Sequence, residues 1–316
     1  MNERPAFMDA ALPENGISHL TTRREFLETL ALGSAGLLLG APSFVEAASN
    51  GSLEYKVNNL VKRMRARGTI RSDERTSWSV YDFTSQKKLV AINEDAPRQA
   101  ASMIKPFVAQ AFFFQASKSS KVRYTAEIRR TMERMIRKSN NSATNRLMSI
   151  VSRNAGNRGA RDVERVLKAN APGIFRETKI VETIPAGGRT YRNLASAHDY
   201  SRFLFALWND KLPYARELRG LMALPNRDRI SDGVDPMPAS ARIYDKTGST
   251  ARLCGNMGII VAPGRLGGTY PYTFVGIIQK SSSAKNYGSW IRRRSNAIRA
   301  VSKLVYLDMK ARHRLV

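Results

Sequence analysis

The spacing of apolar residues changes several times along the chain, and each change marks an expected element. Residues 53–67 and 102–118 carry apolar side chains three or four positions apart, which predicts helices. Residues 76–97 instead alternate between apolar and polar around a polar turn near Thr84–Lys87, which predicts a β-hairpin. The same patterns predict further helices over 124–137, 142–152, 159–169, 195–208, 213–223 and 286–311, and strands over 241–248, 255–263 and 270–280.

The order of these elements predicts the architecture. Strands come from both ends of the chain and helices fill its middle, so we expect an α/β (α+β) domain with one antiparallel sheet covered by the terminal helices. The α/β lobe would comprise residues 52–98 and 225–316, with an all-helical lobe inserted at 99–224. Residues 170–193 are rich in proline and glycine and predict a long loop. A ligand cleft is expected where the two lobes meet.

The N-terminal segment has the features of an export signal. Arg23 and Arg24 precede a short apolar run, Leu30 to Ala41, which is far below the roughly 20 residues that span a bilayer. A small-x-small cleavage pattern follows and ends at Ala47. Residues 1–47 thus resemble a twin-arginine signal, which predicts recognition by the twin-arginine translocase and a periplasmic domain at 48–316. An internal apolar helix is the alternative.

The charge and composition of the chain limit which binding partners and cofactors we expect. The chain has 316 residues and a formal charge of +26, and residues 48–316 alone carry 49 basic and 20 acidic residues. An exported protein meets little nucleic acid, so we expect this charge to attract anionic cell-envelope polymers instead. Cys254 is the single cysteine and there are three histidines, so we expect no disulfide, no metal site and no cofactor. A monomer is expected.

Three short motifs carry the candidate chemistry. Ser102-x-x-Lys105 lies at a predicted helix start, Ser139-Asn140-Asn141 lies between two helices of the middle region, and Lys246-Thr247-Gly248 lies on a predicted strand. The first motif alone is weak, because Ser85–Lys88 and Ser282–Lys285 match it too. The three motifs in this order, however, are the set found in class A β-lactamases and penicillin-binding proteins.

From about residue 52 to its end, the chain therefore resembles the serine β-lactamase and penicillin-binding protein superfamily, most closely the class A β-lactamase fold. The resemblance implies a covalent acyl-enzyme on Ser102. It implies as substrates β-lactams or peptides that end in D-Ala-D-Ala.

Elementary chemistry accounts for the residue types in these motifs. Residues three apart share a helix face, so the Lys105 amine can reach the Ser102 hydroxyl and act as its base. A second cation, Lys246, would help to deprotonate Lys105. Ser139 would relay a proton to the leaving nitrogen, and Asn141 would orient the substrate amide.

The third motif would form the opposite wall of the site. Lys246 and Thr247 suit a substrate carboxylate. The backbone N–H groups of Ser249, just after Gly248, and of Ser102 would form an oxyanion hole. A Ser-His-Asp triad is the competing scheme, but no G-x-S-x-G motif accompanies His198, for which a structural role is expected.

The deacylation residue is less well defined. Class A enzymes use a glutamate in a loop of pattern E-x-x-L-N shortly before Ile-Pro. Counting back from Ile184-Pro185 places Glu177 at that glutamate and Val181 at the asparagine. Glu177 is thus the candidate deacylation base, and a surface glutamate is the alternative. Likewise, Met257 stands where a carboxylate-binding arginine is common, and Arg252 could replace it.

Three functions remain open on this basis. The one favoured by the sequence is a β-lactamase-type hydrolase, supported by the class A architecture and by Glu177 at the expected offset. The second is a D,D-carboxypeptidase or related peptidoglycan hydrolase, which the altered loop favours. The third is a peptidoglycan-binding envelope protein without catalysis, although such a protein has no need of both amines and both hydroxyls.

Overall fold

The computed structural model describes residues 51–185, 187–188 and 191–316. The proposed export signal at 1–47 lies outside the described residues. Those that are described belong to one compact unit, Val45–Val316. No helix among them has the length and apolar character needed to span a membrane.

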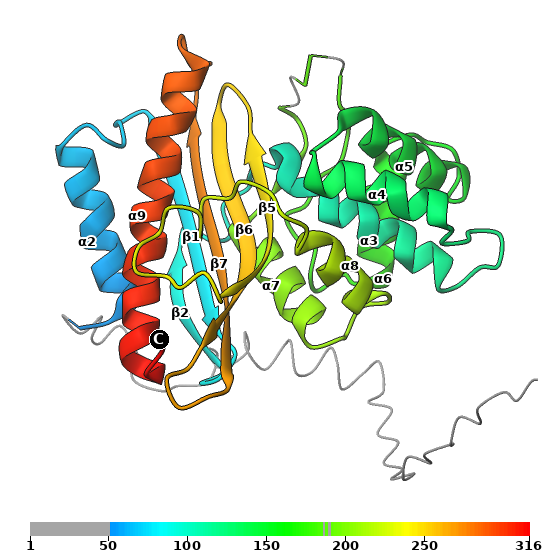
Figure 1. The fold of residues 1–316 in the computed structure, drawn as a ribbon. Helices are drawn as coiled ribbons and strands as arrows, with labels where there is room; N and C mark the ends of the chain where they lie inside the picture. Colours follow the sequence, from blue (N-terminus) through cyan, green and yellow to red (C-terminus); the bar gives the residue numbers. More distant parts are fainter. Residues whose placement is uncertain (1–50, 186, 189–190) are drawn as a thin grey trace, which may run out of the picture. The chain divides into compact units, whose positions relative to one another are not determined.

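A five-stranded antiparallel sheet forms the centre of this unit (Figure 1). Its strand order is β2-β1-β7-β6-β5, so strands from both ends of the chain are neighbours. The strands are β1 (Glu74–Asp82), β2 (Lys87–Ile92), β5 (Arg242–Ser249), β6 (Leu253–Pro263) and β7 (Thr269–Lys280). The α+β fold predicted from the sequence is confirmed, including the hairpin of β1 and β2.

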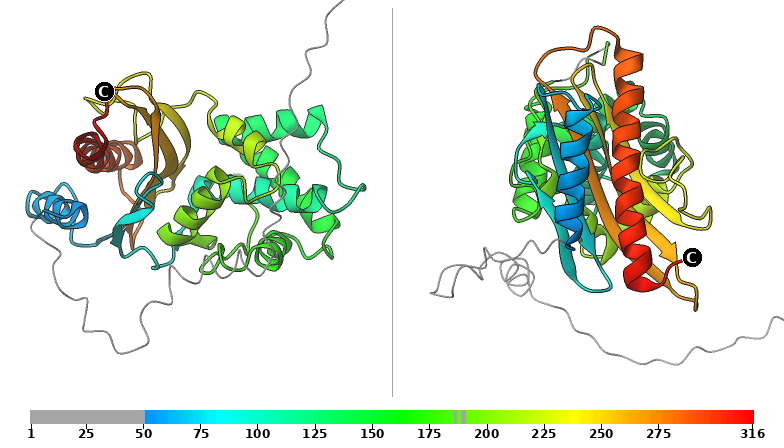
Figure 2. Two further views of the ribbon diagram at one scale, coloured as in Figure 1. Left: turned by 90° about the horizontal axis from the view of Figure 1, so that it is seen from below. Right: turned by 90° about the vertical axis from the view of Figure 1, so that its left-hand side faces the viewer.

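Helices cover both faces of the sheet. The views in Figures 1 and 2 place α2 (Leu53–Ala66) and α9 (Tyr287–His313) together on one face. The helical lobe lies on the other face. Its helices are α3 (Lys105–Ala116), α4 (Ala126–Arg137), α5 (Asn141–Arg153), α6 (Arg161–Asn170), α7 (Ala197–Trp208) and α8 (Ala215–Met222).

Strand β6 shows why the sheet must be covered twice. Cys254 and Ile260 pack with α2 and α9, whereas Met257 and Ile259 pack into the core of the helical lobe. Side chains alternate between the two faces of a strand, so both faces of β6 are apolar and ten of its eleven residues are buried.

Two local features differ from the sequence prediction. The helix expected over 102–118 begins with a 3₁₀ turn, η1 (Ala101–Ile104), and Pro106 then falls in the first turn of α3, where its missing N–H costs no hydrogen bond. The predicted loop 170–193 leads into a short strand, β4 (Leu194–Ala195), which pairs with β3 (Arg98–Gln99). Two-residue strands leave too short a pattern to be recognised in a sequence.

Candidate functional site

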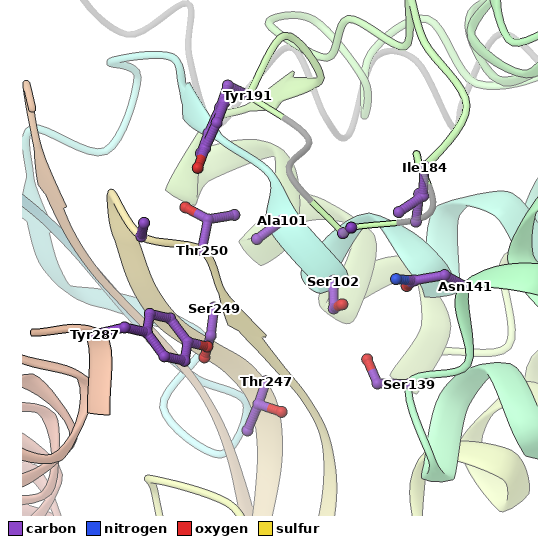
Figure 3. Close-up of a pocket in the computed structure, with 13 residues that line it drawn as sticks. Ala101, Ser102, Ser139, Asn141, Ile184, Tyr191, Thr247, Ser249, Thr250 and Tyr287 are labelled. Atoms are coloured by element: carbon purple, nitrogen blue, oxygen red, sulfur yellow. The ribbon is translucent and has the colours of Figure 1, made fainter. Parts of the chain in front are cut away.

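A cavity of about 600 Å³ lies between the edge strand β5 and the helical lobe. Figure 3 shows Ser102 near its centre, with Ser139 and Asn141 on one side and Thr247 and Ser249 on the other. The three sequence motifs thus meet at one place, at the junction of the two lobes. We call this space the central cavity.

Ser102 is held in place by close packing of η1 against β5. The preceding residue, Ala101, adopts a left-handed backbone with φ of 45°, which a non-glycine residue rarely does without constraint from its surroundings. Gly248 passes so close that a Cβ atom added there would lie 2.9 Å from Cγ of Met103. The glycine of the third motif therefore lets β5 approach the turn that carries Ser102.

Lys105 links the first two motifs. Its side chain is fully buried, and its Nζ lies 3.0 Å from Ser102 Oγ and 3.0 Å from Ser139 Oγ. Nζ also donates to the Ser139 carbonyl oxygen at 2.5 Å and to Asn141 Oδ1 at 3.0 Å. These last two acceptors orient the amine, so that its lone pair in the neutral form can point to a serine hydroxyl. We call Ser102, Lys105, Ser139 and Asn141 the acylation centre.

The second motif is set by a tight backbone turn before α5. Ser139 has a left-handed backbone with φ of 53°, and Asn140 caps α5 by accepting a hydrogen bond from the Ala143 N–H at 2.8 Å. Asn141 Oδ1 accepts a hydrogen bond from Lys105 Nζ. Its amide nitrogen faces Gly188, where an added Cβ would lie 3.3 Å away. That nitrogen is thus available to a substrate that enters beside the loop.

Burial and charge lower the pKa of both lysines. Burial, followed by repulsion from Lys246, lowers the pKa of Lys105 to about 7. Burial, followed by repulsion from Arg229, also lowers the pKa of Lys246, to about 8, against the attraction of Asp245. Near neutral pH a large fraction of Lys105 is therefore the neutral amine, the form that can accept a proton.

Arg229 is a part of the site that sequence reasoning missed. It is buried behind β5, where its Nη2 donates to Ser249 Oγ at 2.6 Å and its Nη1 to the Gly255 carbonyl oxygen at 2.6 Å. Its backbone N–H is held by Asn256 Oδ1. The residue lies in an irregular segment before β5, and no periodicity or motif marks it. Only the folded chain brings this cation to the third motif.

A buried carboxylate balances these cations. Burial and the nearby Asp228 raise the pKa of Asp245 to about 6, in spite of hydrogen bonds from Asn226 and Asn256. Above that pH the Asp245 carboxylate favours the charged form of Lys246. The sequence places Asp245 beside the third motif but gives no sign that it is buried.

The β5 wall continues beyond the third motif to an aromatic and basic rim. Thr247, Ser249 and Thr250 line the central cavity. At its edge the Arg252 guanidinium lies 4.9 Å from the ring centroid of Tyr191, which also lines the cavity. No carboxylate among the described residues pairs with Arg252. Met257, by contrast, is fully buried in the core.

The predicted deacylation loop is held differently from the acylation centre. The backbone N–H of Glu177 donates to Asp199 Oδ2 at 3.0 Å, and Thr178 Oγ donates to the same oxygen at 2.6 Å. Glu177 is not among the residues that line the central cavity. Val181 borders a separate surface depression that α6 also lines.

Glu182 has a definite structural part in this loop. Its Oε1 accepts hydrogen bonds from the backbone N–H groups of Tyr191 and Arg192, both at 3.0 Å. Ile184, three residues before the wall glycine Gly187, is tied to Asn145 by a hydrogen bond in each direction. No acidic side chain belongs to the described residues that line the central cavity.

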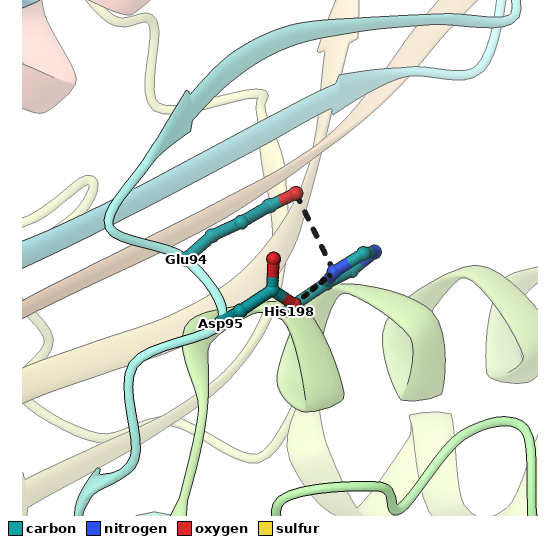
Figure 4. A group of neighbouring side chains, drawn as sticks. All are labelled: Glu94, Asp95 and His198. Atoms are coloured by element: carbon teal, nitrogen blue, oxygen red, sulfur yellow. Dashed lines mark hydrogen bonds and ion pairs between the residues drawn. The ribbon is translucent and has the colours of Figure 1, made fainter. Parts of the chain in front are cut away.

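His198 lies apart from the acylation centre, in a cluster with Glu94 and Asp95 (Figure 4). Its Nδ1 is 2.7 Å from Asp95 Oδ1 and 3.5 Å from Glu94 Oε1. Among the described residues, these three side chains are the group whose nitrogen and oxygen atoms lie close enough together to hold a metal ion. However, Lys88 Nζ already lies 2.7 Å from Glu94 Oε2, so an ammonium group neutralises the most buried of the carboxylates.

The comparisons with solved structures show the fold. PBP-A matches with a TM-score of 0.64 and 18% identity, over 84% of this chain and 97% of its own. An ancestral class A β-lactamase (GNCA) matches with a TM-score of 0.62 and 19% identity, over 81% and 100%. A class A β-lactamase from Bacteroides cellulosilyticus gives 0.63 and 15%, over 82% and 99%. No curated protein sequence matches the chain.

Fold and comparisons together define the class of protein, the serine β-lactamase and penicillin-binding protein superfamily. Within it, the chain belongs to the beta-lactamase enzyme family, whose model matches residues 117–307. That match contains the second and third motifs but begins after Ser102 and Lys105. The role of the first motif therefore stays a prediction, supported by the geometry described above.

Proposed function

We propose that this protein is an active-site serine hydrolase of the penicillin-binding type. In this proposal Ser102 is acylated by β-lactams and by peptides ending in D-Ala-D-Ala, and the β-lactam acyl-enzyme is released slowly. The observation that carries it is the position of Lys105, whose buried amine lies 3.0 Å from both the Ser102 and the Ser139 hydroxyl oxygens.

Acylation follows from the geometry of the acylation centre. The neutral Lys105 amine takes the Ser102 proton, and Oγ attacks the substrate carbonyl carbon. The backbone N–H groups of Ser102 and Ser249 stabilise the resulting oxyanion. Ser139 then delivers a proton to the leaving nitrogen and recovers one from Lys105, so that the C–N bond breaks and the amine is neutral again.

Substrate binding would use the walls on either side. The Asn141 amide nitrogen suits the carbonyl oxygen of a substrate amide group. Thr247 and Lys246 suit the substrate carboxylate, as the sequence predicts. Arg252 lies over Tyr191 at the rim and donates to Ser283 Oγ, and no described carboxylate pairs with it. It offers a second charge for an acyl donor that carries a further carboxylate.

Slow release is supported by the lining of the central cavity. Hydrolysis of an acyl-enzyme needs a base that activates water. None of the described residues lining this cavity is acidic, and Glu177 is not among them. Val181 borders a different depression, and Glu182 Oε1 accepts a hydrogen bond from the Tyr191 backbone N–H. A β-lactamase is the second candidate, favoured by the position of Glu177 at the expected distance before Ile184.

Export to the periplasm is part of the same proposal. The paired arginines and the cleavage pattern at 45–47 support a twin-arginine signal, and the basic charge of residues 48–316 would hold the protein near anionic envelope polymers. Cell fractionation of the full chain tests this. The wild type is expected in the periplasm, and R23K/R24K in the cytoplasm; equal distributions would refute the signal.

The test of the chemistry is intact-protein mass spectrometry of residues 48–316 mixed with benzylpenicillin, followed over time. Parallel samples receive a pentapeptide ending in D-Ala-D-Ala, from which free D-alanine is measured. A penicillin adduct that persists for hours, together with D-alanine release, is the expected result. An adduct that disappears within seconds while penicillin is consumed would identify a β-lactamase. Absence of any adduct would favour a non-catalytic peptidoglycan-binding protein.

A further inference from the structure

A second cavity, of about 480 Å³, lies at the beginning of α9. Its lining combines the turn before β1, the end of β7 and the segment 282–290. Tyr287 of that segment faces the central cavity instead (Figure 3). The same short segment therefore separates two cavities of different character, and we call the second one the basic cavity.

The basic cavity gathers cations with too few acidic partners. Arg71, Lys285 and Arg293 line it and form no hydrogen bond or ion pair through their side chains with the described residues. Asp73 is the acidic residue of its lining, so the cations are in excess there. Like charges held together repel each other, and a bound anion would relieve that repulsion.

Lys280 makes this more than an exposed basic patch. The residue is only 8% exposed, yet its ammonium group has no hydrogen-bond acceptor among the described residues. Its nearest partner is Asp73 Oδ2 at 3.6 Å, beyond hydrogen-bond distance. Lys280 lines the cavity, and an ammonium group carries three donors, so its ion pair with Asp73 leaves donors for a further acceptor. A group that enters the cavity and accepts a hydrogen bond would use them.

Glu74, the carboxylate next to Asp73 in the sequence, is already engaged by other donors. Arg294 is buried, and its Nε lies 2.8 Å from Glu74 Oε1, which also accepts from Trp290 Nε1 at 2.6 Å. These two bonds occupy Glu74 Oε1, so this oxygen is not available to Lys280. Its Oε2 in turn accepts from the Arg71 backbone N–H at 2.9 Å and fixes the turn that carries the Arg71 side chain.

The remaining lining suits an oxyanion with several acceptor oxygens. Ser282 and Ser289 contribute hydroxyl groups that have no side-chain partner among the described residues. The N-terminus of α9 adds partial positive charge, since this helix runs for 27 residues and Asn286 caps it. Hydroxyl, ammonium and guanidinium donors around one space are the usual environment of a phosphate group.

We propose that the basic cavity binds a phosphate group, as a monoester or diester, of a cell-envelope component. The binding is separate from the acylation chemistry and can be measured without it, whereas the cell-envelope origin of the ligand rests on the export proposed above. Because segment 282–290 lines both cavities, a polymer or lipid held by its phosphate would lie beside the mouth of the central cavity. Phosphate binding would thus place the hydrolase at its substrate surface.

The experiment compares residues 48–316 with two triple variants that lose the same charge. The test variant is R71Q/K285Q/R293Q, and the control is K121Q/R123Q/R130Q, which changes three exposed cations of the helical lobe. Inorganic phosphate and pyrophosphate are titrated calorimetrically at constant ionic strength, and vesicles with and without phosphatidylglycerol are used in sedimentation. Thermal unfolding followed by circular dichroism checks that each variant is folded.

Wild type and control are expected to bind pyrophosphate, and the test variant to bind it about ten-fold more weakly or not at all. Loss of vesicle binding in the test variant alone would identify a lipid headgroup as the ligand, whereas phosphate binding without vesicle binding would identify a free or polymer phosphate. Equal affinities in the test and control variants, or no phosphate binding by the wild type, would overturn the proposal.

Discussion

The acylation centre and the loop at 171–193 border the same cavity, but their hydrogen bonds hold different kinds of group. In the acylation centre one buried amine contacts two serine hydroxyls, a carbonyl and an amide oxygen within 3.0 Å. The loop is also held by hydrogen bonds, through Asp199 and Asn193, but these bonds fix its backbone N–H groups, and no acidic side chain is among the described residues that line the cavity. The difference teaches that forming and releasing an acyl-enzyme need separate structural elements, and the function proposed above assigns only the first to the described lining of this cavity.

The most severe way to break the acylation centre is to remove its nucleophile or its base. S102A is expected to abolish the penicillin adduct, and K105A to slow its formation at least about 1000-fold, because the serine loses its only nearby amine base. The rate is measured by intact mass spectrometry. S282A, in a second S-x-x-K sequence, is the matched control and should acylate like wild type. A normal acylation rate in K105A would show that another group acts as base.

The pH dependence of acylation sharpens the assignment of the base. Neutral Lys105 is required, so the rate should rise as pH increases through about 7, the lowered pKa of Lys105. It should fall again above about 8 as Lys246 loses its charge, with the two apparent values belonging to the coupled pair.

Removal of the second cation moves this profile. K246A eliminates the repulsion that lowers the pKa of Lys105, so the rising limb should move to higher pH and the rate at pH 7 should fall about ten- to hundred-fold. The profile is obtained from acylation rates between pH 5 and 10. A rising limb that stays in place would mean that burial alone sets the pKa of Lys105.

A smaller effect is expected at the rim of the central cavity. R252A removes a cation that lies over the Tyr191 ring and has no carboxylate partner among the described residues, so a substrate with a carboxylate in its acyl arm should lose about ten-fold in kcat/KM. An uncharged analogue of the same size serves as the matched substrate and should be affected less than two-fold. Equal losses for both substrates would indicate a structural role for Arg252.

The smallest effect is expected at Glu177. It tests most directly whether the loop supplies a deacylation base. E177Q should change the lifetime of the penicillin adduct by less than about three-fold, because Glu177 does not line the central cavity. The lifetime is followed by mass spectrometry after free penicillin is removed. E182Q is the companion variant, expected to loosen the loop through Tyr191 and Arg192. A much longer-lived adduct in E177Q alone would make Glu177 the deacylation base.

Particular residues show which parts of the fold and of the site could be predicted from the sequence. The α+β fold was predictable because β6 and β7 are long apolar runs and the middle helices have regular spacing. The meeting of Ser102, Ser139 and Thr247 followed from three ordered motifs. Each of these features is encoded by neighbouring residues, and its location needs no knowledge of distant contacts.

Arg229 and Lys280 show what was not predictable. Both are cations in a chain with 52 lysines and arginines, and nothing in their local sequence separates them from solvated surface residues. Their burial arises from contacts far along the chain, with Ser295 at 2.9 Å in one case and Asp73 at 3.6 Å in the other. Tertiary burial of a charged residue leaves no periodic signal.

The strand order of the sheet has a consequence for the time at which the protein becomes active. Strand β1 pairs with β7, about 200 residues further along the chain, and β5 reaches the sheet only through β6. Ser102 and Lys105 are synthesised early, but the wall that holds Lys246 has no partner until β6 and β7 have emerged. Pairing over such separations is slow compared with the formation of local helices. A ribosome-bound chain that ends before β7 would therefore carry Ser102 in a helical lobe without the β5 wall, and the proposed reactivity toward acyl donors would appear only after β7 has emerged.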